Sequence, residues 1–481
     1  MNILYVTGEA APYAASGGLG DVMGALPKSV KKLLGKESNV GVILPLYATI
    51  APTHREKMEK ISEFWFYHSW RNSYCAVYRL HDNGVNYYFV DNEYYFKRGN
   101  LYGDFDDGER FAYFSHAVLE FILHENLVPD IFHANDWQAA LSVVYAKLKY
   151  GDNPMLSRMK TVFTIHNIEY QGKFGIEVIG DLFDLSPQHT SVLEYDGCLN
   201  LLKGAMICAD RVTTVSPNYK DELRNDFFAF GLQYVVQMCL PKMDGVINGI
   251  DTTAFSSKNS DIPVTYSLRD IASGKGQNKA LLQEELGLPV RPDVPLIVMI
   301  TRLTEGKGVD LVLHVFEEML TLDVQFVLLG TGDKKYEQIF SDLASRNCDR
   351  ARALIKFDRI LSKRMYAAAD IFLMPSKSEP CGLAQMIACS YGTVPVVRNV
   401  GGLHDSIIPY GEEDANGFRF DNFNAHELLF TVKDAVQLYR DDPKGWDALR
   451  RNAMRTDFRW TRSAEKYIEI YARASGMEKG N

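Results

Sequence analysis

The sequence predicts an α/β protein with two doubly wound, Rossmann-like domains, and three observations support this prediction. The chain has 481 residues, which is more than one hydrophobic core usually organises. Short apolar runs recur along it without alternating apolar and polar residues, as is typical of strands buried on both faces of a parallel sheet. Helical patterns lie between several of these runs, and alternating strands and helices favour a doubly wound sheet.

Composition and charge limit the partners that the chain can bind. Its residues are 46% hydrophobic, 12% aromatic and 23% charged, which is typical of a globular protein. The net charge of -9, from 52 cationic and 61 anionic side chains, opposes broad binding to nucleic acid or to an anionic membrane. We therefore expect no nucleic-acid partner and no membrane partner, and we expect any bound anion to occupy a local site.

Cysteine use and the start of the chain indicate a cytoplasmic protein. The seven cysteines include no C-x-x-C pair, which indicates neither a disulfide framework nor a structural zinc site. The first residues lack a cationic start and a cleavage site, and no uninterrupted apolar stretch approaches the length of a bilayer span. A reducing cytosol fits this pattern.

Both halves of the chain show the same strand and helix rhythm. In the first half, the predicted strands are 3–6, 40–44, 87–90, 131–133, 161–165 and 212–215, and the predicted helices are 110–123 and 138–148. In the second half, the predicted strands are 296–300, 325–329, 353–357, 371–374 and 393–397, and the predicted helices are 308–320 and 383–391. Residues 259–276 are polar and without a clear period, so we expect a loop there and a domain boundary near 248–261. The tail 460–471 has helical spacing and should pack against a domain.

Glycine turns follow predicted strands in both halves. The segment Ser16-Gly17-Gly18-Leu19-Gly20-Asp21 precedes a helical pattern, and Gly401-Gly402-Leu403-His404-Asp405 echoes it in the second half. Glycines let a ligand approach the backbone, and free N–H groups at a helix start favour an anion. Ligands of open α/β sheets bind at the carboxyl ends of strands, so two such domains facing a central cleft suit a diphosphate. The alternative is that these glycines serve turn geometry only.

Two cations follow the predicted strand 296–300. Arg302 and Lys307 stand in a loop in which glycines flank the lysine. An arginine fork and a compact lysine charge suit two non-bridging phosphate oxygens. The alternative is a pair of solvated loop charges.

Residues 378–385 follow the predicted strand 371–374 and open a helix. Glu379 would lie at the carboxyl end of the sheet, where it can accept hydrogen bonds from sugar hydroxyls. The amides of Gly382 and Leu383 would form an anion-binding turn at the helix start. The alternative for Glu379 is a helix cap, and Cys381 has no neighbouring histidine that would make it a nucleophile.

Polar groups also end two predicted strands of the first half. His133 to Trp137 and Thr164 to Asn167 can hydrogen-bond hydroxyl groups, and Trp137 can stack on a sugar face. A lone histidine is more often structural than catalytic, but two such strand ends favour a polyol site. Gly330 begins a further turn after the predicted strand 325–329.

Taken together, these motifs resemble the bacterial glycogen and starch synthase family. The resemblance runs in order from Met1 to about Tyr471, and the co-occurrence of its motifs is more specific than any one of them. Its motifs are Gly17-Gly18-Leu19, 133–137, 164–167, Val246-Ile247-Asn248-Gly249-Ile250-Asp251, 301–308, 379–383, Gly392-Thr393-Val394-Pro395 and Gly401-Gly402-Leu403.

The resemblance implies a fold and a reaction. The fold is GT-B, with an N-terminal Rossmann-like domain at 1–250, a nucleotide-sugar-binding domain at 251–456 and a C-terminal helix at 457–481 that returns to the first domain. The reaction transfers glucose from ADP-glucose to the non-reducing end of an α-1,4-glucan such as glycogen, starch or a malto-oligosaccharide. It proceeds with retention of configuration, without a cofactor and without a metal ion.

The resemblance also implies roles for individual residues. Arg302 and Lys307 neutralise the departing diphosphate, which fits the charge that develops when the anomeric bond breaks. The catalytic residues implied are Arg302, Lys307, Glu379, His166 and Asp136. Donor-binding positions are Ser16, Gly17, Gly18, Asn248, Gly330, Cys381, Gly382 and Leu383. On the acceptor side we expect Tyr95 and Trp137.

One departure from the family pattern leaves an alternative open. The family usually places a lysine two residues before the first glycine of the GGL loop, and this chain has Ala15 there. A missing charge-assisted contact to phosphate is worth about 1.5 to 3 kcal/mol. The alternative is therefore a glucan-binding or regulatory paralogue with weakened catalysis, and a third hypothesis is a GT-B enzyme that uses another nucleotide sugar.

Overall fold

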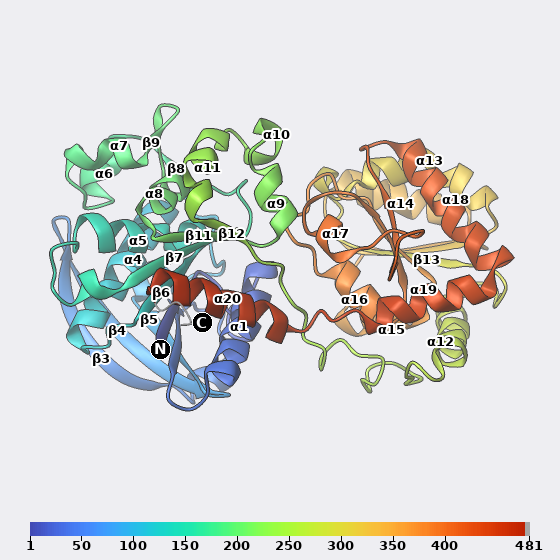
Figure 1. Ribbon diagram of the computed structural model, residues 1–481, viewed down its shortest axis with the longest axis horizontal. Helices are drawn as coiled ribbons and strands as arrows, with labels where there is room; N and C mark the ends of the chain where they lie inside the picture. Colours follow the sequence, from blue (N-terminus) through green and yellow to red (C-terminus); the bar gives the residue numbers. More distant parts are fainter. Residues whose placement is uncertain (477–481) are drawn as a thin grey trace. The chain divides into compact units, whose positions relative to one another are not determined.

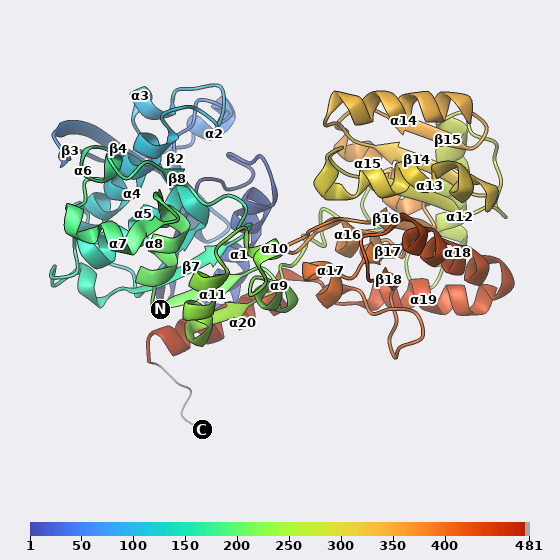
Figure 2. The same ribbon diagram turned by 90° about the horizontal axis from the view of Figure 1, so that it is seen from above.

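The chain forms two compact units. The computed structural model describes residues 1–476, and it is drawn in two views in Figures 1 and 2. Unit 1 comprises Met1–Asn248 and the C-terminal segment from Trp460, and unit 2 comprises Gly249–Arg459. In residues 1–476, no helix combines the length and the apolar character needed to cross a membrane.

Unit 1 is built on a mixed sheet whose central strands are parallel. Its strand order is β12-β11-β7-β6-β1-β2-β5-β4-β3, and only β4 and β3, at one edge, run antiparallel to their neighbours. The strands are β1 (Asn2–Val6), β2 (Asn39–Pro45), β3 (Glu59–His68), β4 (Arg71–Asp82), β5 (Val85–Asp91), β6 (Ile131–Asn135), β7 (Lys160–Ile165), β11 (Arg211–Thr214) and β12 (Met243–Gly245). A small separate sheet holds β8 (Lys173–Phe174), β10 (Cys198–Asn200) and β9 (Glu194–Tyr195).

Helices surround the two sheets of unit 1, and the C-terminal helix is one of them. They are α1 (Gly18–Leu34), α2 (Pro52–Arg55), α3 (Glu93–Phe96), α4 (Asp107–His124), α5 (Asp136–Leu148), α6 (Val178–Asp181), α7 (Thr190–Leu193), α8 (Leu201–Cys208), α9 (Pro217–Glu222), α10 (Asp226–Ala229), α11 (Gln233–Cys239) and α20 (Trp460–Ala474). Helix α20 lies beside α1 (Figure 1).

A buried chain of hydrogen bonds anchors α20 to the sheet. The Tyr471 hydroxyl contacts His133 Nδ1 on β6 at 2.8 Å and the Tyr5 hydroxyl on β1 at 2.9 Å. His133 Nε2 contacts Thr164 Oγ1 on β7 at 2.6 Å. Because His133 is fully buried among these neutral partners, its pKa is lowered to about 3 and it is a neutral structural residue.

Unit 2 is a wholly parallel sheet with helices on both faces. The strand order is β15-β14-β13-β16-β17-β18. The strands are β13 (Leu296–Ile300), β14 (Gln325–Leu329), β15 (Ala351–Leu354), β16 (Ile371–Met374), β17 (Val394–Arg398) and β18 (Phe418–Phe420). The chain leaves β13 toward β14 and later returns to β16 on its other side, so the strand order reverses between β13 and β16. In doubly wound sheets, ligands bind at the carboxyl ends of the strands beside such a reversal.

The helices of unit 2 bury its core between them and the sheet. Helices α13 and α18 pack together on one face, and α12 and α15 pack together on the other (Figure 1). The helices are α12 (Ile271–Glu285), α13 (Val309–Thr321), α14 (Lys334–Arg346), α15 (Arg359–Ala368), α16 (Ala384–Ser390), α17 (Gly401–Ser406), α18 (Ala425–Asp441) and α19 (Pro443–Arg455). Val312, Val315 and Phe316 of α13 meet Ile297 and Phe326 of the sheet within one apolar cluster.

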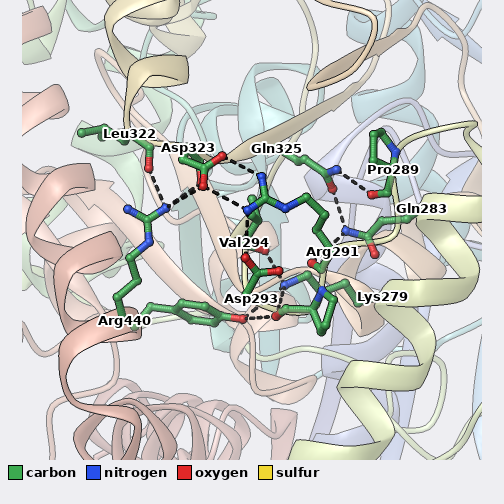
Figure 3. Close-up of polar contacts among 12 residues, drawn as sticks. Lys279, Gln283, Pro289, Arg291, Asp293, Val294, Leu322, Asp323, Gln325 and Arg440 are labelled. Atoms are coloured by element: carbon green, nitrogen blue, oxygen red, sulfur yellow. Dashed lines mark hydrogen bonds and ion pairs between the residues drawn. The ribbon is translucent and has the colours of Figure 1, made fainter.

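A polar network closes the amino-terminal edge of this sheet (Figure 3). Lys279 of α12 donates to the carbonyl of Val294 at 2.5 Å and to Asp370 Oδ2 at 2.7 Å. Gln283 donates to Gln325 Oε1 at 2.7 Å. Beside these buried groups, Arg291 donates to the Asp323 carboxylate and Arg440 donates to the Asp323 backbone carbonyl. The network ties α12 to the starts of β13 and β14, at the edge opposite the ligand-binding ends.

The structure confirms most of the predicted elements, corrects two and adds others that were not predicted. The predicted strands 296–300, 325–329 and 371–374 coincide with β13, β14 and β16, and the predicted tail helix is α20. The predicted strand 353–357 is displaced, since β15 is Ala351–Leu354 and Phe357, outside it, is 90% exposed. The predicted loop 259–276 is wrong in its last part, because α12 begins at Ile271. The β3–β4 hairpin was not predicted, and its exposed aromatic side chains give one of its two faces to solvent.

Candidate active site

In unit 1, a buried carboxylate organises the first glycine loop. Glu9 follows β1 and is 2% exposed, and its Oε2 accepts hydrogen bonds from the amides of Ser16 at 2.6 Å and Gly17 at 3.3 Å. Its Oε1 accepts from Ser16 Oγ at 2.7 Å and from the Tyr102 hydroxyl. Sequence reasoning missed Glu9, although an acidic residue three positions beyond a buried strand was a usable signal. The loop is therefore held in place before any ligand binds.

The glycines of this loop stand beside open space. Gly17 and Gly18 are exposed, and a Cβ atom added to either would meet nothing within 4 Å. By contrast, a Cβ on Gly20 would lie 2.4 Å from the Cβ of Ala15, so Ala15 packs against the start of α1. A ligand can thus approach the backbone at Gly17 and Gly18, and position 15 lies within the same loop.

Asp136 and His166 form a hydrogen-bonded group at the ends of β6 and β7. Asp136 has a φ of 56°, a left-handed conformation at the start of α5, and its Oδ1 accepts from the His166 amide at 2.7 Å. His166 Nε2 contacts Asn135 Oδ1 at 3.0 Å. Because the Asn135 amide nitrogen already donates to the carbonyls of Val6 and His133, Asn135 Oδ1 is the acceptor and His166 Nε2 carries the proton.

Burial sets the charges of this pair. It raises the pKa of Asp136 to about 7, although backbone amides of His166 and Asn167 oppose the shift. It lowers the pKa of His166 to about 3, so the imidazole is neutral at physiological pH. With its Nε2 proton engaged, His166 presents Nδ1 as an acceptor for a hydrogen bond from a hydroxyl group.

The other sequence-predicted residues of unit 1 have differing environments. Trp137 is half-buried and its ring contacts Phe111 edge to face at 5.2 Å. Asn248 is 6% exposed and its Oδ1 has no hydrogen-bond partner among residues 1–476, so a ligand donor could satisfy it. Tyr95 is 4% exposed and its hydroxyl donates to Glu109 at 2.8 Å, so its ring is not accessible for stacking. The adjacent Tyr94 is 72% exposed.

In unit 2, the predicted charges meet at the strand-order reversal. Lys307 follows β13 and Glu379 follows β16, and Lys307 Nζ lies 2.6 Å from Glu379 Oε2. Ser376 Oγ donates to the same carboxylate at 3.0 Å. Arg302 is exposed, and within residues 1–476 it forms no ion pair. The carboxyl ends of the two central strands therefore carry one paired lysine, one unpaired arginine and one fixed carboxylate.

The turn after Glu379 presents free backbone donors. Gly382 has a φ of +71°, in the region that favours glycine, and within the described chain neither its amide nor that of Leu383 donates a hydrogen bond. The second glycine turn supports this one, because the Gly402 amide donates to the Glu379 carbonyl at 3.1 Å. A Cβ on Gly402 would lie 2.2 Å from the Cys381 carbonyl oxygen, so the two turns are in close contact.

Two further predicted positions have their groups engaged inside the protein. The Gly330 amide donates to the Leu354 carbonyl at 3.1 Å, and a Cβ there would lie 1.8 Å from the Thr301 carbonyl oxygen. Gly330 therefore brings the ends of β13 and β14 together. The side chain of Cys381 is buried, so any contact from this residue to a ligand has to use its backbone.

Comparison with known proteins places this geometry in a class of enzymes. The family model of the starch synthase catalytic domain matches residues 2–238, and that of the group 1 glycosyl transferases matches residues 285–453. A sucrose-phosphate synthase from Thermosynechococcus elongatus shares the fold, with a TM-score of 0.60 at 16% identity over 99% of this chain and 100% of that one. The two Rossmann-like units are those of a GT-B glycosyltransferase.

Closer relatives define the family. The chain is 44% identical to the glycogen synthase of Bacillus cereus over 98% of this chain and 99% of the relative, and 44% identical to that of Geobacillus stearothermophilus over 98% and 97%. The catalytic domain of starch synthase IV from Arabidopsis thaliana, solved with ADP and acarbose, superposes with a TM-score of 0.89 at 32% identity over 98% and 99% of the two chains. The chain belongs to the glycogen synthase family.

Full-length similarity to glycogen synthases bears on the alternatives. The matched region is 98% of this chain, so it includes nearly all of both units. An active glycosyltransferase is therefore favoured over a glucan-binding or regulatory paralogue.

Proposed function

We propose that the protein transfers glucose from ADP-glucose to the non-reducing end of an α-1,4-glucan, with retention of configuration and without a metal ion. The observation that carries the proposal is the group at the ends of β13 and β16, where Lys307 and Glu379 lie 2.6 Å apart beside the free amides of Gly382 and Leu383. Relatives named glycogen synthase, and a starch synthase bound to ADP, support the same donor class.

The charges of unit 2 suit a departing nucleoside diphosphate. When the bond between the anomeric carbon and the diphosphate oxygen breaks, negative charge accumulates on the phosphates. The Arg302 guanidinium and the Lys307 ammonium can neutralise it as a metal ion otherwise would, and the two free amides add fixed dipoles. Once the phosphates share Lys307, the carboxylate of Glu379 remains in place to accept hydrogen bonds from the sugar hydroxyls.

The polar group of unit 1 suits a sugar. The neutral His166 offers Nδ1 to a hydroxyl, and the Asp136 carboxyl lies beside it in a shielded position. In its ionised form, the Asp136 carboxylate favours the positive, oxocarbenium-like character that a sugar acquires in the transition state. We assign Asn248 Oδ1 to the donor and Trp137 to the glucan on the same chemical grounds.

The assay uses radiolabelled ADP-glucose and maltotetraose. We expect longer malto-oligosaccharides whose new linkages are α-1,4 by NMR, equal rates with and without EDTA, and slower transfer from UDP-glucose. No transfer at millimolar ADP-glucose would contradict the proposal. Faster transfer from another nucleotide sugar would support the third hypothesis, and loss of activity with EDTA would contradict metal independence.

A charge-removing variant tests the diphosphate role. Lys307→Ala should lower kcat by about 10²- to 10³-fold, the usual cost of removing one group that stabilises a developing anion. The control is Lys356→Ala, which removes an exposed lysine paired with Asp358 and should leave kcat unchanged. Equal kcat values for Lys307→Ala and the wild type would exclude Lys307 from catalysis.

A further inference from the structure

Unit 1 contains a buried pair of histidines far from the sites described above. His68 ends β3 and His116 lies in the middle of α4, and they are 0% and 2% exposed. Their Nδ1 atoms face each other at 3.0 Å. Asp184, in the segment after α6, places Oδ2 3.6 Å from His116 Nδ1 and 4.0 Å from His68 Nδ1. Three possible ligand atoms thus converge from three separate segments of the chain.

The neighbours of the two rings determine which nitrogens carry protons. His68 Nε2 lies 2.8 Å from the carbonyl oxygen of Leu182, which can only accept, so His68 Nε2 carries a proton. His116 Nε2 lies 2.7 Å from the Tyr150 hydroxyl, which in turn contacts the Glu120 carboxylate. The Tyr150 hydroxyl donates its only proton in the hydrogen bond to Glu120. Its oxygen therefore accepts a hydrogen bond from His116, whose Nε2 carries a proton.

This assignment leaves acceptors facing one another. With both Nε2 atoms protonated, two neutral rings present two Nδ1 lone pairs at 3.0 Å, and a carboxylate oxygen lies beside them. Lone pairs in such contact repel each other unless a cation lies between them. Lys149 contacts the Asp184 carboxylate, but no hydrogen bond joins it to either ring within residues 1–476. A further cation between the two Nδ1 atoms, either a shared proton or a metal ion, would remove this repulsion.

The geometry points to a metal ion, and we propose that His68, His116 and Asp184 bind a divalent transition ion such as Zn²⁺. Zinc bonds of about 2.0 to 2.2 Å in a tetrahedron place neighbouring ligand atoms about 3.3 Å apart. The ligand atoms here are 3.0, 3.6 and 4.0 Å apart. Zinc-bound imidazoles usually donate their other N–H to a carbonyl or a carboxylate-linked group, as both rings do here.

The surroundings also permit entry of an ion. Asp184 and Lys149 are 20% and 28% exposed, so the fourth position opens toward solvent, and Lys149 can move aside or remain hydrogen-bonded to the bound carboxylate. The second cluster of carboxylates in the described chain differs. Asp104, Asp106 and Asp107 each already form an ion pair with Arg98 or Arg110, so these carboxylates have cationic partners within the protein.

The ion would stabilise unit 1 and would take no part in transfer. Helix α5 begins at Asp136 and ends next to Lys149, so the cluster lies about 20 Å along this helix from the proposed sugar site. The three ligands join the β3–β4 hairpin, α4 and the segment after α6. The inference does not rest on the proposed function, and metal binding and transfer are measured separately.

Zinc titration of the full-length protein tests the proposal. We expect one Zn²⁺ per chain with micromolar or tighter affinity in competition with a chromogenic chelator, and a rise in Tm of about 5 °C at a hundredfold excess over Kd. Asp184→Asn, which keeps the side-chain shape, should weaken binding at least tenfold, and Lys149→Gln should strengthen it because the competing ammonium is removed. His81→Gln, an exposed histidine outside the cluster, is the matched control and should bind like the wild type.

Cobalt spectra identify the ligands without any variant. Co²⁺ at the site should show the visible bands of a four-coordinate ion with nitrogen and oxygen ligands, and no thiolate charge-transfer band. A thiolate band would assign the ion to the cysteines and overturn the proposal. Absence of stoichiometric Zn²⁺ binding would overturn it too and would assign the histidine contact to a shared proton. Zn²⁺ binding that is unchanged in Asp184→Asn would also overturn the proposal, because the ion would then occupy another site.

Discussion

At the scale of single residues, one buried glutamate in each unit is hydrogen-bonded to a glycine turn. Glu9 accepts the amides of Ser16 and Gly17, and Glu379 is held by Lys307 and Ser376 while its carbonyl accepts the Gly402 amide. Glu9 thus holds its glycine loop through its side-chain carboxylate, whereas Glu379 contacts the second glycine turn through its backbone carbonyl. Glycine loops are conformationally permissive, so such anchors reduce the entropy lost when a ligand binds.

Ala15 is the position at which a single charge should change donor binding. A lysine there would extend from an exposed loop position toward the open space beside Gly17 and Gly18. A charge-assisted hydrogen bond to phosphate contributes about 1.5 to 3 kcal/mol. Ala15→Lys should therefore lower the Kd for ADP, measured by calorimetry, by about one to two powers of ten.

The control for this substitution is Ala15→Met, which adds a side chain of similar length without the charge. It should leave the Kd for ADP close to that of the wild type. Equal Kd values for Ala15→Lys and Ala15→Met would mean that position 15 does not reach the phosphates.

Asp136 should make stability fall as the pH rises. Its pKa is raised by burial from an ordinary 3.8 to about 7, so the native state holds a proton that the unfolded state has released. Between about pH 4 and pH 7 the free energy of unfolding therefore decreases with pH, and the cost is complete above pH 7. The size of this contribution is about 2 to 4 kcal/mol.

Asp136→Asn isolates that contribution. Asparagine tolerates the left-handed backbone at this position and keeps an oxygen for the His166 amide. Urea denaturation between pH 5 and pH 8 should show a smaller decline for the variant than for the wild type. Parallel pH profiles for the two proteins would show that Asp136 is ionised in the native state throughout this range.

At the scale of elements, α20 illustrates how one hydroxyl can anchor a helix. Tyr471→Phe removes the hydrogen-bond partner of two buried polar atoms, His133 Nδ1 and the Tyr5 hydroxyl. The expected loss in the free energy of unfolding is about 1 to 3 kcal/mol, measured by urea denaturation. Amide exchange in α20 should rise in parallel.

Tyr234→Phe is the matched control, because this tyrosine of the same unit is 70% exposed and its substitution should change stability little. If both variants lost the same stability, the buried hydroxyl network would not be what anchors α20.

An apolar period is the basis of the helices predicted from the sequence, and the start of α12 lacks such a period. Helix α13 follows the predicted 308–320 because its apolar stripe faces the core. The predicted loop 259–276 extends over the first six residues of α12, whose helical period is hidden because the helix buries polar side chains such as Lys275, Asn278 and Lys279. These side chains are buried because backbone carbonyls and Asp370 satisfy them, and no local pattern reveals such distant partners.

The candidate site was predictable to a similar extent. Arg302, Lys307 and Glu379 could be placed at strand ends from the sequence, but the 2.6 Å contact between Lys307 and Glu379 joins residues 72 positions apart. Glu9 was missed because its role depends on the fold of the loop that it holds. Tyr95 was predicted to face a ligand, and its burial against Tyr113 could be seen only once the helices were packed.

At the scale of the whole molecule, the chain consists of two units with separate cores. The chain passes between them at Asn248 and Gly249 and again at Arg459 and Trp460, and each unit has its own sheet. The stability of unit 2 depends on the network at its amino-terminal edge, whereas its proposed ligand groups lie at the carboxyl ends of the same strands. Stability and ligand binding are thus assigned to opposite edges of one sheet.

A substitution in this network should destabilise one unit and spare the other. Lys279 and Asp370 lie 2.7 Å apart with exposures of 4% and 8%, and Asp370 Oδ2 also accepts the Leu296 amide at 2.9 Å. Asp370→Asn leaves the Lys279 charge buried without its partner, which costs about 3 to 5 kcal/mol. In hydrogen exchange measured by mass spectrometry, amides of unit 2 should lose protection at a lower urea concentration than in the wild type, while the protection of unit 1 amides should not change.

Asp293→Asn is the control, since this 65% exposed carboxylate pairs with Arg291 at the surface and contributes little to stability. Simultaneous loss of protection in both units, in the wild type and in Asp370→Asn, would show instead that the chain unfolds as one cooperative body.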